Sequence, residues 1–200
     1  TVTAAPVITT QPTNQTVTVG ANASFTVAAS GTPTPTYQWQ LSTNGGVSWT
    51  NLTNAAPYGG VTTATLTVTN ATAGLSGAQY RAVATNSAGT ATSTAATLAV
   101  TTAPAITTQP TNQTLTAGQT ASFTVAASGT PAPTYQWQLS TDSGVSWTNL
   151  TNTAPYSGVT TATLTATSVT TSLTGAQYRA VATNSVGSAT SNAATLTVNS

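Results

Sequence analysis

Apolar and polar residues alternate along several short stretches of the chain. Residues 24–30 read SFTVAAS, residues 37–41 read YQWQL and residues 63–69 read TATLTVT. A period of two is typical of antiparallel strands that bury one face and leave the other in water. The segments GTPTP (31–35) and TNGG (43–46) separate these stretches and predict turns. The pattern therefore predicts strands joined by short loops, with Phe25, Val27, Ala64, Leu66 and Val68 among the inward-facing residues.

The whole pattern occurs twice, 98 residues apart. ITTQPTNQT begins at Ile8 and again at Ile106, and GAQYRAVATNS begins at Gly77 and again at Gly175. This period is too long for a helical repeat unit and suits a complete small domain. About seven strands in fewer than about 100 residues predict a two-sheet sandwich. The sequence thus predicts an all-β fold of two tandem domains, with helix limited to a turn near residues 71–77 and its copy.

The repeat also sets the expected domain boundaries. Residues 1–3 align with residues 99–101, the end of a repeat, so we expect them to be the tail of a preceding copy. The two domains should then span residues 4–101 and 102–200.

Two stretches in each copy carry a family resemblance. The segment YQW holds Trp39 and Trp137, and the segment QYRAVATNS holds Tyr80 and Tyr178. Together they resemble immunoglobulin-like domains of the I-set kind, in the form common in bacterial surface proteins. The resemblance implies a core tryptophan and a corner tyrosine whose hydroxyl bonds to nearby backbone. It also implies an extracellular or cell-surface location.

The chain departs from that family at its disulfide, because it contains no cysteine. Losing a native disulfide typically costs about 2–5 kcal/mol, whereas burying a valine side chain contributes about 1.5–3 kcal/mol. Hydrophobic replacements therefore offset much of the loss, and the resemblance implies a cysteine-free core. The expected core residues are Val27, Trp39, Tyr80 and Ala82 in the first copy and Val125, Trp137, Tyr178 and Ala180 in the second.

A second motif reads STNGGVSW at residues 42–49 and STDSGVSW at residues 140–147. The spacing Ser-x-Asp-x-Gly-x-x-Trp resembles the Asp-box hairpin of sialidases. Asn or Asp accepts local backbone N–H groups, and Gly takes a positive φ, so the motif predicts a structural hairpin between two strands. The alternative is that its tryptophan is exposed and also contacts sugar. The motif residues are Ser42, Asn44, Gly46 and Trp49, and Ser140, Asp142, Gly144 and Trp147.

Charged residues are almost missing, which limits the chemistry. They make up 2% of the chain, give a net charge of +1, and are Arg81, Arg179 and Asp142. A typical glycosidase needs two carboxyl groups, and the chain has one. Without His or Cys it has no catalytic triad or ordinary zinc site, so we expect no enzyme activity, metal or cofactor. A net charge of +1 disfavours nucleic acid, and no apolar run is long enough to span a membrane.

Two surface features leave alternatives open. Arg81 and Arg179 follow the corner tyrosines and should point outward beside glutamines, either as a small polar binding patch or as a solvated strand edge. The threonines of residues 63–69 should share one strand face, with Thr16 and Thr18 on the same sheet, either as an array that binds ice or as ordinary β-branched residues of a strand.

These observations favour a non-catalytic structural module of a long extracellular repeat protein, such as a stalk, spacer or surface fibre. The expected partners are neighbouring repeats of the same protein. Uncharged sheet edges also favour self-association into fibres. The alternatives are an adhesin or carbohydrate-binding module for a neutral glycan, and an accessory domain of a secreted enzyme. Exposure of Trp49 and Trp147 should discriminate, since burial would remove a platform for sugar.

Overall fold

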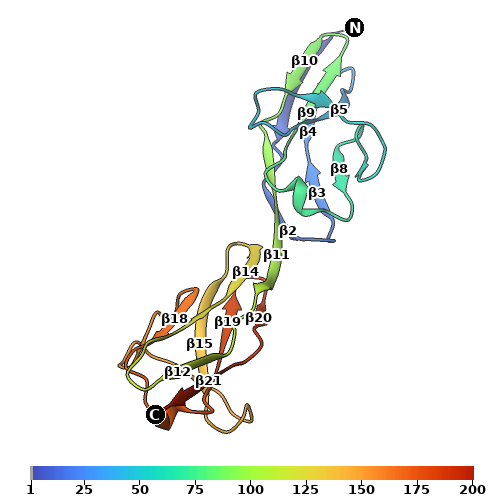
Figure 1. The fold of residues 1–200 in the computed structure, drawn as a ribbon. Helices are drawn as coiled ribbons and strands as arrows, with labels where there is room; N and C mark the ends of the chain where they lie inside the picture. Colours follow the sequence, from blue (N-terminus) through green and yellow to red (C-terminus); the bar gives the residue numbers. More distant parts are fainter. Residues whose placement is uncertain (1) are drawn as a thin grey trace. The chain divides into compact units, whose positions relative to one another are not determined.

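The computed structural model describes residues 2–200, so Thr1 of the expected N-terminal tail lies outside the described residues. The described chain consists of short β-strands and two single-turn 3₁₀ helices (Figure 1). Contacts within it separate into two units, the first ending at Thr101 and the second spanning Thr102–Ser200. Each unit is described by itself below.

The elements of the first unit are β1 (Ala4–Thr10), β2 (Gln15–Thr18), β3 (Ala23–Thr26), β4 (Ala28–Thr32), β5 (Thr36–Ser42), β6 (Thr50–Asn51), β7 (Tyr58–Gly59), β8 (Thr65–Val68), η1 (Ala73–Leu75), β9 (Gln79–Asn86), β10 (Gly89–Thr92) and β11 (Ala96–Thr108). The second unit adds β12 (Gln113–Thr116), β13 (Ala121–Thr124), β14 (Ala126–Thr130), β15 (Thr134–Ser140), β16 (Thr148–Asn149), β17 (Tyr156–Ser157), β18 (Thr163–Ala166), η2 (Thr171–Leu173), β19 (Gln177–Thr183), β20 (Ser188–Thr190) and β21 (Ala194–Asn199).

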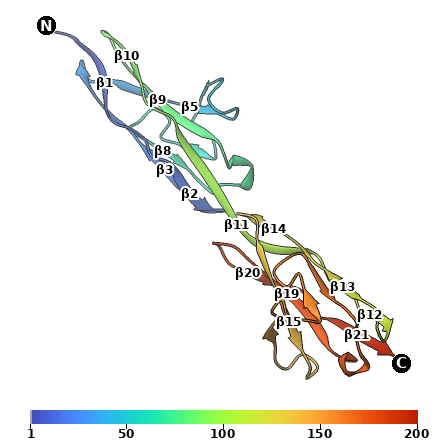
Figure 2. The same ribbon diagram turned by 90° about the vertical axis from the view of Figure 1, so that its left-hand side faces the viewer.

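Two sheets face each other in the first unit. One has the order β2–β11–β9–β5–β6, with β10 also paired to β9. The other contains β3–β8–β7, and β1 pairs with β4 beside it. All pairs are antiparallel except β2 with β11, whose parallel register joins Gln15 to Leu98 and Thr18 to Thr101 (Figure 2).

The second unit repeats this arrangement. Its sheets have the orders β12–β21–β19–β15–β16 and β13–β18–β17, and β12 runs parallel to β21. Strand β11 contributes to both units, because residues 98–101 pair with β2 and residues 102–108 pair with β14. The prediction of two tandem all-β sandwiches is confirmed, and the 3₁₀ helices η1 and η2 lie where the turns were expected.

Alternation along the strands explains why the chain folds this way. In β3, Phe25 is buried between exposed Ser24 and Thr26, and it lies opposite Leu66 of β8. Ala64 was expected to face inward, but it is exposed, because β8 begins only at Thr65 and Ala64 belongs to the preceding turn. The backbone of Ala64 still bonds to the neighbouring strand segment, because its carbonyl oxygen accepts the backbone N–H of Val27 at 2.9 Å.

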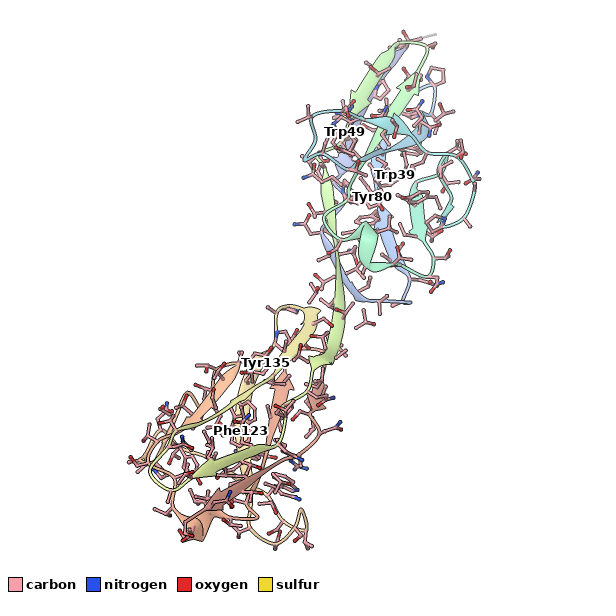
Figure 3. All side chains as sticks on the ribbon, viewed as in Figure 1. Trp39, Trp49, Tyr80, Phe123 and Tyr135 are labelled. Carbon is pink, nitrogen blue, oxygen red and sulfur yellow. The ribbon has the colours of Figure 1, made fainter. Side chains whose placement is uncertain are left out.

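The eight residues expected in the cores are all buried. Figure 3 labels two of them, Trp39 and Tyr80. Trp39 is fully buried and lies opposite Ala82 in the register of β5 and β9. Its indole Nε1 donates to the carbonyl oxygen of Thr63 at 2.9 Å, so the one polar atom of this side chain has a partner. Trp137 makes the same bond to Thr161. Val27 and Ala82 thus fill the space that the family assigns to its disulfide with apolar atoms.

The expectation for the corner tyrosines is wrong. The hydroxyl of Tyr80 has no hydrogen-bond partner in the described residues, and that of Tyr178 lies 3.1 Å from the hydroxyl of Tyr156 rather than from backbone. The rings of Phe25 and Tyr58 lie 4.9 and 6.1 Å from the ring of Tyr80, centre to centre, so this side chain packs among aromatic side chains. Burial raises the pKa of both corner tyrosines, and the bond to Tyr156 adds to this at Tyr178.

The threonine rows also differ from expectation. The row at residues 63–69 belongs mainly to β8, in the sheet with β3, whereas Thr16 and Thr18 lie on β2 in the opposite sheet. The prediction that they share a sheet is wrong, because β2 pairs with β11. Three hydroxyls of the row are already bonded to backbone carbonyl oxygens: Thr63 donates to Gly60 at 3.0 Å, Thr67 to Gly59 at 3.2 Å and Thr69 to Pro57 at 3.1 Å. Within residues 2–200, no helix is long and apolar enough to cross a membrane.

Candidate functional site: the β5–β6 hairpin and its sheet face

The hairpin motif connects β5 to β6, as the sequence predicts. Ser42, at the end of β5, is buried, and its Oγ accepts the backbone N–H of Gly46 at 2.9 Å. The same hydroxyl donates to Oδ1 of Asn44 at 2.9 Å. Asn44 Oδ1 in turn accepts the backbone N–H of Ser48 at 3.0 Å. The first and third motif residues therefore satisfy the loop's own backbone groups and close the hairpin.

The conformation of the loop requires glycine at position 46. Gly46 has φ +87°, a region that residues with a Cβ seldom adopt. A Cβ at this position would also lie 3.1 Å from Oε1 of Gln79 and 3.7 Å from the ring of Trp49. The hairpin thus folds over β9, and its tryptophan lies against the loop.

The second hairpin has the same bonds with a carboxylate. Ser140 Oγ donates to Oδ1 of Asp142 at 2.7 Å, and that oxygen accepts the Ser146 N–H at 2.9 Å. The Ser146 hydroxyl donates to the other carboxylate oxygen. These bonds, first the one from the Ser146 hydroxyl, lower the pKa of Asp142 from 3.8 to about 2. The carboxylate is therefore a charged acceptor inside a turn, and it is not poised to act as an acid near neutral pH.

The tryptophan of the first hairpin is half-buried and supports an arginine. Trp49 Nε1 donates to the carbonyl oxygen of Gly46 at 3.0 Å. Cζ of Arg81, on β9, lies 4.2 Å from the centre of the Trp49 ring, within the range of a cation–π contact. Arg81 Nε donates to Gln40 Oε1 at 2.8 Å, and Gln40 Nε2 donates to Asn51 Oδ1 at 2.8 Å. A connected polar row thus crosses β9, β5 and β6.

The second unit has the same row. Arg179 lies 4.1 Å from the ring centre of Trp147 and donates to Gln138 at 2.8 Å, and Gln138 donates to Asn149 at 2.9 Å. In both units the tryptophan is half-buried, so its exposure does not exclude a contact with sugar. An arginine, however, lies over each ring. The arginines are held in place rather than loose at a solvated edge.

Sequence reasoning missed the contact between Trp49 and Arg81. The two residues are far apart in the chain, and their approach depends on the register that places Gln40 beside Arg81. The contact between Trp49 and Arg81 could have been inferred from the outward position of Arg81 next to the glutamines of β5.

The hairpin and its row hold no set of groups for catalysis. Within the described residues, no three His, Cys, Asp or Glu side chains come together as a metal site. The chain's one acidic side chain is engaged by Ser140 and Ser146, and a second carboxyl group for glycoside cleavage does not exist in this sequence.

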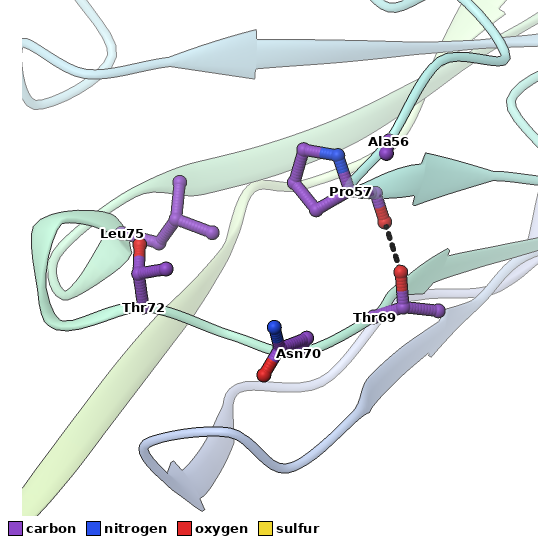
Figure 4. A pocket seen from close by; sticks show the side chains of 6 residues that line it. All are labelled: Ala56, Pro57, Thr69, Asn70, Thr72 and Leu75. Atoms are coloured by element: carbon purple, nitrogen blue, oxygen red, sulfur yellow. Dashed lines mark hydrogen bonds between the residues drawn. The ribbon is translucent and has the colours of Figure 1, made fainter.

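A pocket of about 400 Å³ lies elsewhere in the first unit (Figure 4). It is formed by the loop before β7 and by the segment that runs from the end of β8 into η1. Its lining residues are Ala56, Pro57, Thr69, Asn70, Thr72 and Leu75.

Comparisons with known proteins give the family. The sequence model of the immunoglobulin I-set domain matches residues 6–100 and again residues 104–198. Endoglucanase C of Cellulomonas fimi is 40% identical over 195 residues, which are 97% of this chain and 16% of that protein. The chain therefore spans about a sixth of the length of this curated relative.

Solved structures show the same fold. The I-band fragment I67–I69 of titin aligns with 98% of the chain and 66% of its own length, with a TM-score of 0.72 and 22% identity. Sidekick-1 immunoglobulin domains 1–4 align with 99% of the chain and 50% of their own length, with a TM-score of 0.72 and 23% identity. At this identity the likeness concerns the fold alone. With both family matches covering nearly all of its length, the chain belongs to the immunoglobulin I-set domain family, as two consecutive members without cysteine.

Proposed function

We propose that this tandem is a non-catalytic accessory module that separates other domains of an extracellular glucan-active protein. The observation that carries the proposal is the alignment with Endoglucanase C, which covers nearly the whole of this chain but only 16% of that protein. Most of the relative's length, and so the room for its catalytic part, lies outside the matched region. The alignment with the endoglucanase therefore favours the accessory role over the role of a stalk or surface fibre.

The composition of the tandem supports a spacer. Each unit has its own apolar cluster, built around Trp39 in the first and Trp137 in the second, so each can fold around its own core. The only carboxylate side chain is engaged in a hairpin, and the surface carries almost no charge that would attract or repel a charged substrate. A spacer needs stable domains with an inert surface, and it needs no reactive group.

The test inserts the 200-residue chain between a glucan hydrolase domain and a separate glucan-binding domain. The controls are a direct fusion of the two domains and a fusion through a flexible Gly/Ser linker of equal residue count. At saturating concentrations of soluble glucan we expect equal rates for all three proteins, because the tandem adds no catalytic group. On insoluble glucan, the fusion with the tandem should be faster than the direct fusion. The isolated chain should release no reducing sugar.

Two results would reject the spacer role. One is a rate on insoluble glucan that is no higher with the tandem than in the direct fusion. The other is a changed rate at saturating soluble glucan, which would mean that the tandem contributes to the reaction itself.

Self-association into fibres stays a separate prediction. Strand β1 (Ala4–Thr10) carries no charged residue, and Val7 on it is 59% exposed, so this edge lacks the charges that usually prevent pairing with another chain. Because few charges are available for screening, any association should respond little to salt. Light scattering across protein and salt concentrations measures this, and particles that stay monomeric throughout would exclude the fibre.

A further inference from the structure

The pocket of the first unit has apolar walls and a polar floor. Ala56, Pro57 and Leu75 supply the walls, while Thr69, Asn70 and Thr72 supply hydroxyl and amide groups. Figure 4 shows the Asn70 amide nitrogen directed toward the space between Pro57 and Leu75. The volume of about 400 Å³ is within the range of about 300–1,000 Å³ for small-molecule sites.

Two polar groups of this pocket are available to a ligand. Within residues 2–200, the hydroxyl of Thr69 is bonded to Pro57, but neither the side-chain amide of Asn70 nor the hydroxyl of Thr72 bonds to protein. A ligand with hydroxyl groups can therefore bond to both side chains without breaking an existing contact.

The floor of the pocket is fixed before any ligand arrives. Asn70 has φ +52°, and its backbone N–H donates to Oδ1 of Asn22 at 2.9 Å. The next residue, Ala71, exchanges backbone hydrogen bonds with the β2–β3 turn, donating to Ala21 at 2.9 Å and accepting from Gly20 at 2.8 Å. These bonds fix the backbone of the floor, so only the side chains remain to be ordered on binding, which favours affinity.

The chemistry of the lining selects the class of ligand. No lining residue carries a charge, so an ion would find no counter-charge. A purely apolar ligand would leave the Asn70 amide and Thr72 hydroxyl without partners as it displaced water from them, which costs free energy. A pyranose ring has an apolar C–H face for Pro57 and Leu75 and hydroxyl groups for the floor.

We propose that this pocket binds a neutral glucose residue of a glucan, with Asn70 and Thr72 bonding to its hydroxyl groups. The choice of glucan rests on the proposed function, whereas the choice of a neutral sugar rests on the lining itself. The site would hold substrate near the neighbouring catalytic domain and would take no part in bond cleavage.

The second repeat supplies an internal comparison. Its corresponding segment has Ser168 where the first has Asn70, with nearly the same backbone angle, φ +50°. It retains Pro155 and Leu173, and Thr170 is also present, but the Thr170 hydroxyl lies 2.7 Å from that of Ser172, which replaces Gly74 of the first repeat. The shorter hydroxyl of Ser168 cannot reach as far as an amide, so the first repeat should bind the sugar more tightly.

The test is a titration of the ¹⁵N-labelled 200-residue chain with cellotetraose, followed by NMR. We expect saturable shifts of the Asn70 side-chain amide and of the Thr72 and Leu75 backbone signals, with smaller shifts around Ser168. Asn70→Ser should weaken binding about 3- to 10-fold, the loss expected for one hydrogen bond. Asn70→Gly keeps the positive φ and should weaken binding similarly, which separates loss of the amide from backbone strain. Ser168→Asn should strengthen binding at the second repeat.

The matched control is Asn192→Ser, which makes the same change at an exposed asparagine outside both the pocket and the hairpin row. It should leave the affinity unchanged. Shifts centred on Trp49 and Asn51, unchanged affinity in Asn70→Ser and Asn70→Gly, or no saturable shift at all would each overturn the proposal. The fusion test stays separate: if the pocket fails, the spacer effect persists, and an Asn70→Ser fusion shows how much of any gain on insoluble glucan comes from binding.

Discussion

The two hairpins of this chain have the same hydrogen-bond scheme but differ at two adjacent positions. Asn44 and Gly45 in the first correspond to Asp142 and Ser143 in the second. The oxygen that closes the loop accepts the serine N–H at 3.0 Å in one and 2.9 Å in the other. An amide and a carboxylate thus serve equally as this acceptor. The comparison shows that the motif depends on an oxygen at the right place and does not require a charge.

The second terminal atom of each side chain, Nδ2 of Asn44 and Oδ2 of Asp142, shows what the charge changes. Asn44 Nδ2 donates to the Ser48 hydroxyl at 2.8 Å, whereas Asp142 Oδ2 accepts from the Ser146 hydroxyl. The serine hydroxyl reverses its direction to suit either neighbour. Only the second hairpin therefore responds to acid.

The largest expected effect tests whether the two cores are equivalent. Trp39→Ala and Trp137→Ala should each cost about 3–5 kcal/mol, because both rings are fully buried and their indole N–H groups are bonded. Calorimetry should show the altered unit unfolding first, while the other unit keeps its transition. A much smaller cost in one unit would break the equivalence.

The buried serine of each hairpin should come next. Ser42→Ala and Ser140→Ala should each destabilise their unit by about 1–2 kcal/mol, because each change leaves a partly buried backbone N–H, of Gly46 or Gly144, without its acceptor. Urea unfolding measures the change, with the exposed Ser48→Ala as the control of small effect. If Ser42→Ala were as mild as that control, the hairpin would not depend on this bond.

The exchange of Gly45 and Ser143 should give effects of opposite sign. Gly45 has φ +70° and Ser143 has φ +60°, so both positions are left-handed. Gly45→Ser should cost about 1 kcal/mol, since residues with a Cβ are strained in this region. Ser143→Gly should stabilise by less, because glycine also makes the unfolded chain more flexible. Melting curves of the two variants test this, and two changes of the same sign would contradict it.

The smallest effect at neutral pH, and the most selective one, concerns Asp142. Its pKa falls from 3.8 in the unfolded chain to about 2 in the fold, so the folded state favours the carboxylate. This contribution is complete above about pH 4 and is lost as the pH falls through 3.8 toward 2. Asp142→Asn should therefore melt like the natural chain at neutral pH and lose less stability in acid. Identical acid profiles for the two proteins would show that the carboxylate makes no contribution.

Most of the fold could be predicted from the sequence because the physical signals are local. Alternation of Phe25 and Val27 with polar residues identifies a strand with one buried face, and recurrence of the pattern identifies two domains. The hairpin was also predictable, because the bonds of Ser42, Asn44 and Gly46 join residues only two to four positions apart.

The remaining features depend on how distant segments meet. No local pattern states that Arg81 lies over Trp49, that β2 runs beside β11 rather than in the sheet of β8, or that the Tyr178 hydroxyl meets Tyr156 instead of backbone. The pocket at Asn70 arises in the same way, where the loop before β7 meets the segment between β8 and η1. By itself the sequence determined the strands, the repeat and the hairpins, because side-chain periodicity and turn chemistry act over a few residues. Register and sheet partners were decided only by the tertiary structure, since packing the two sheets around the tryptophans selects which surface groups become neighbours.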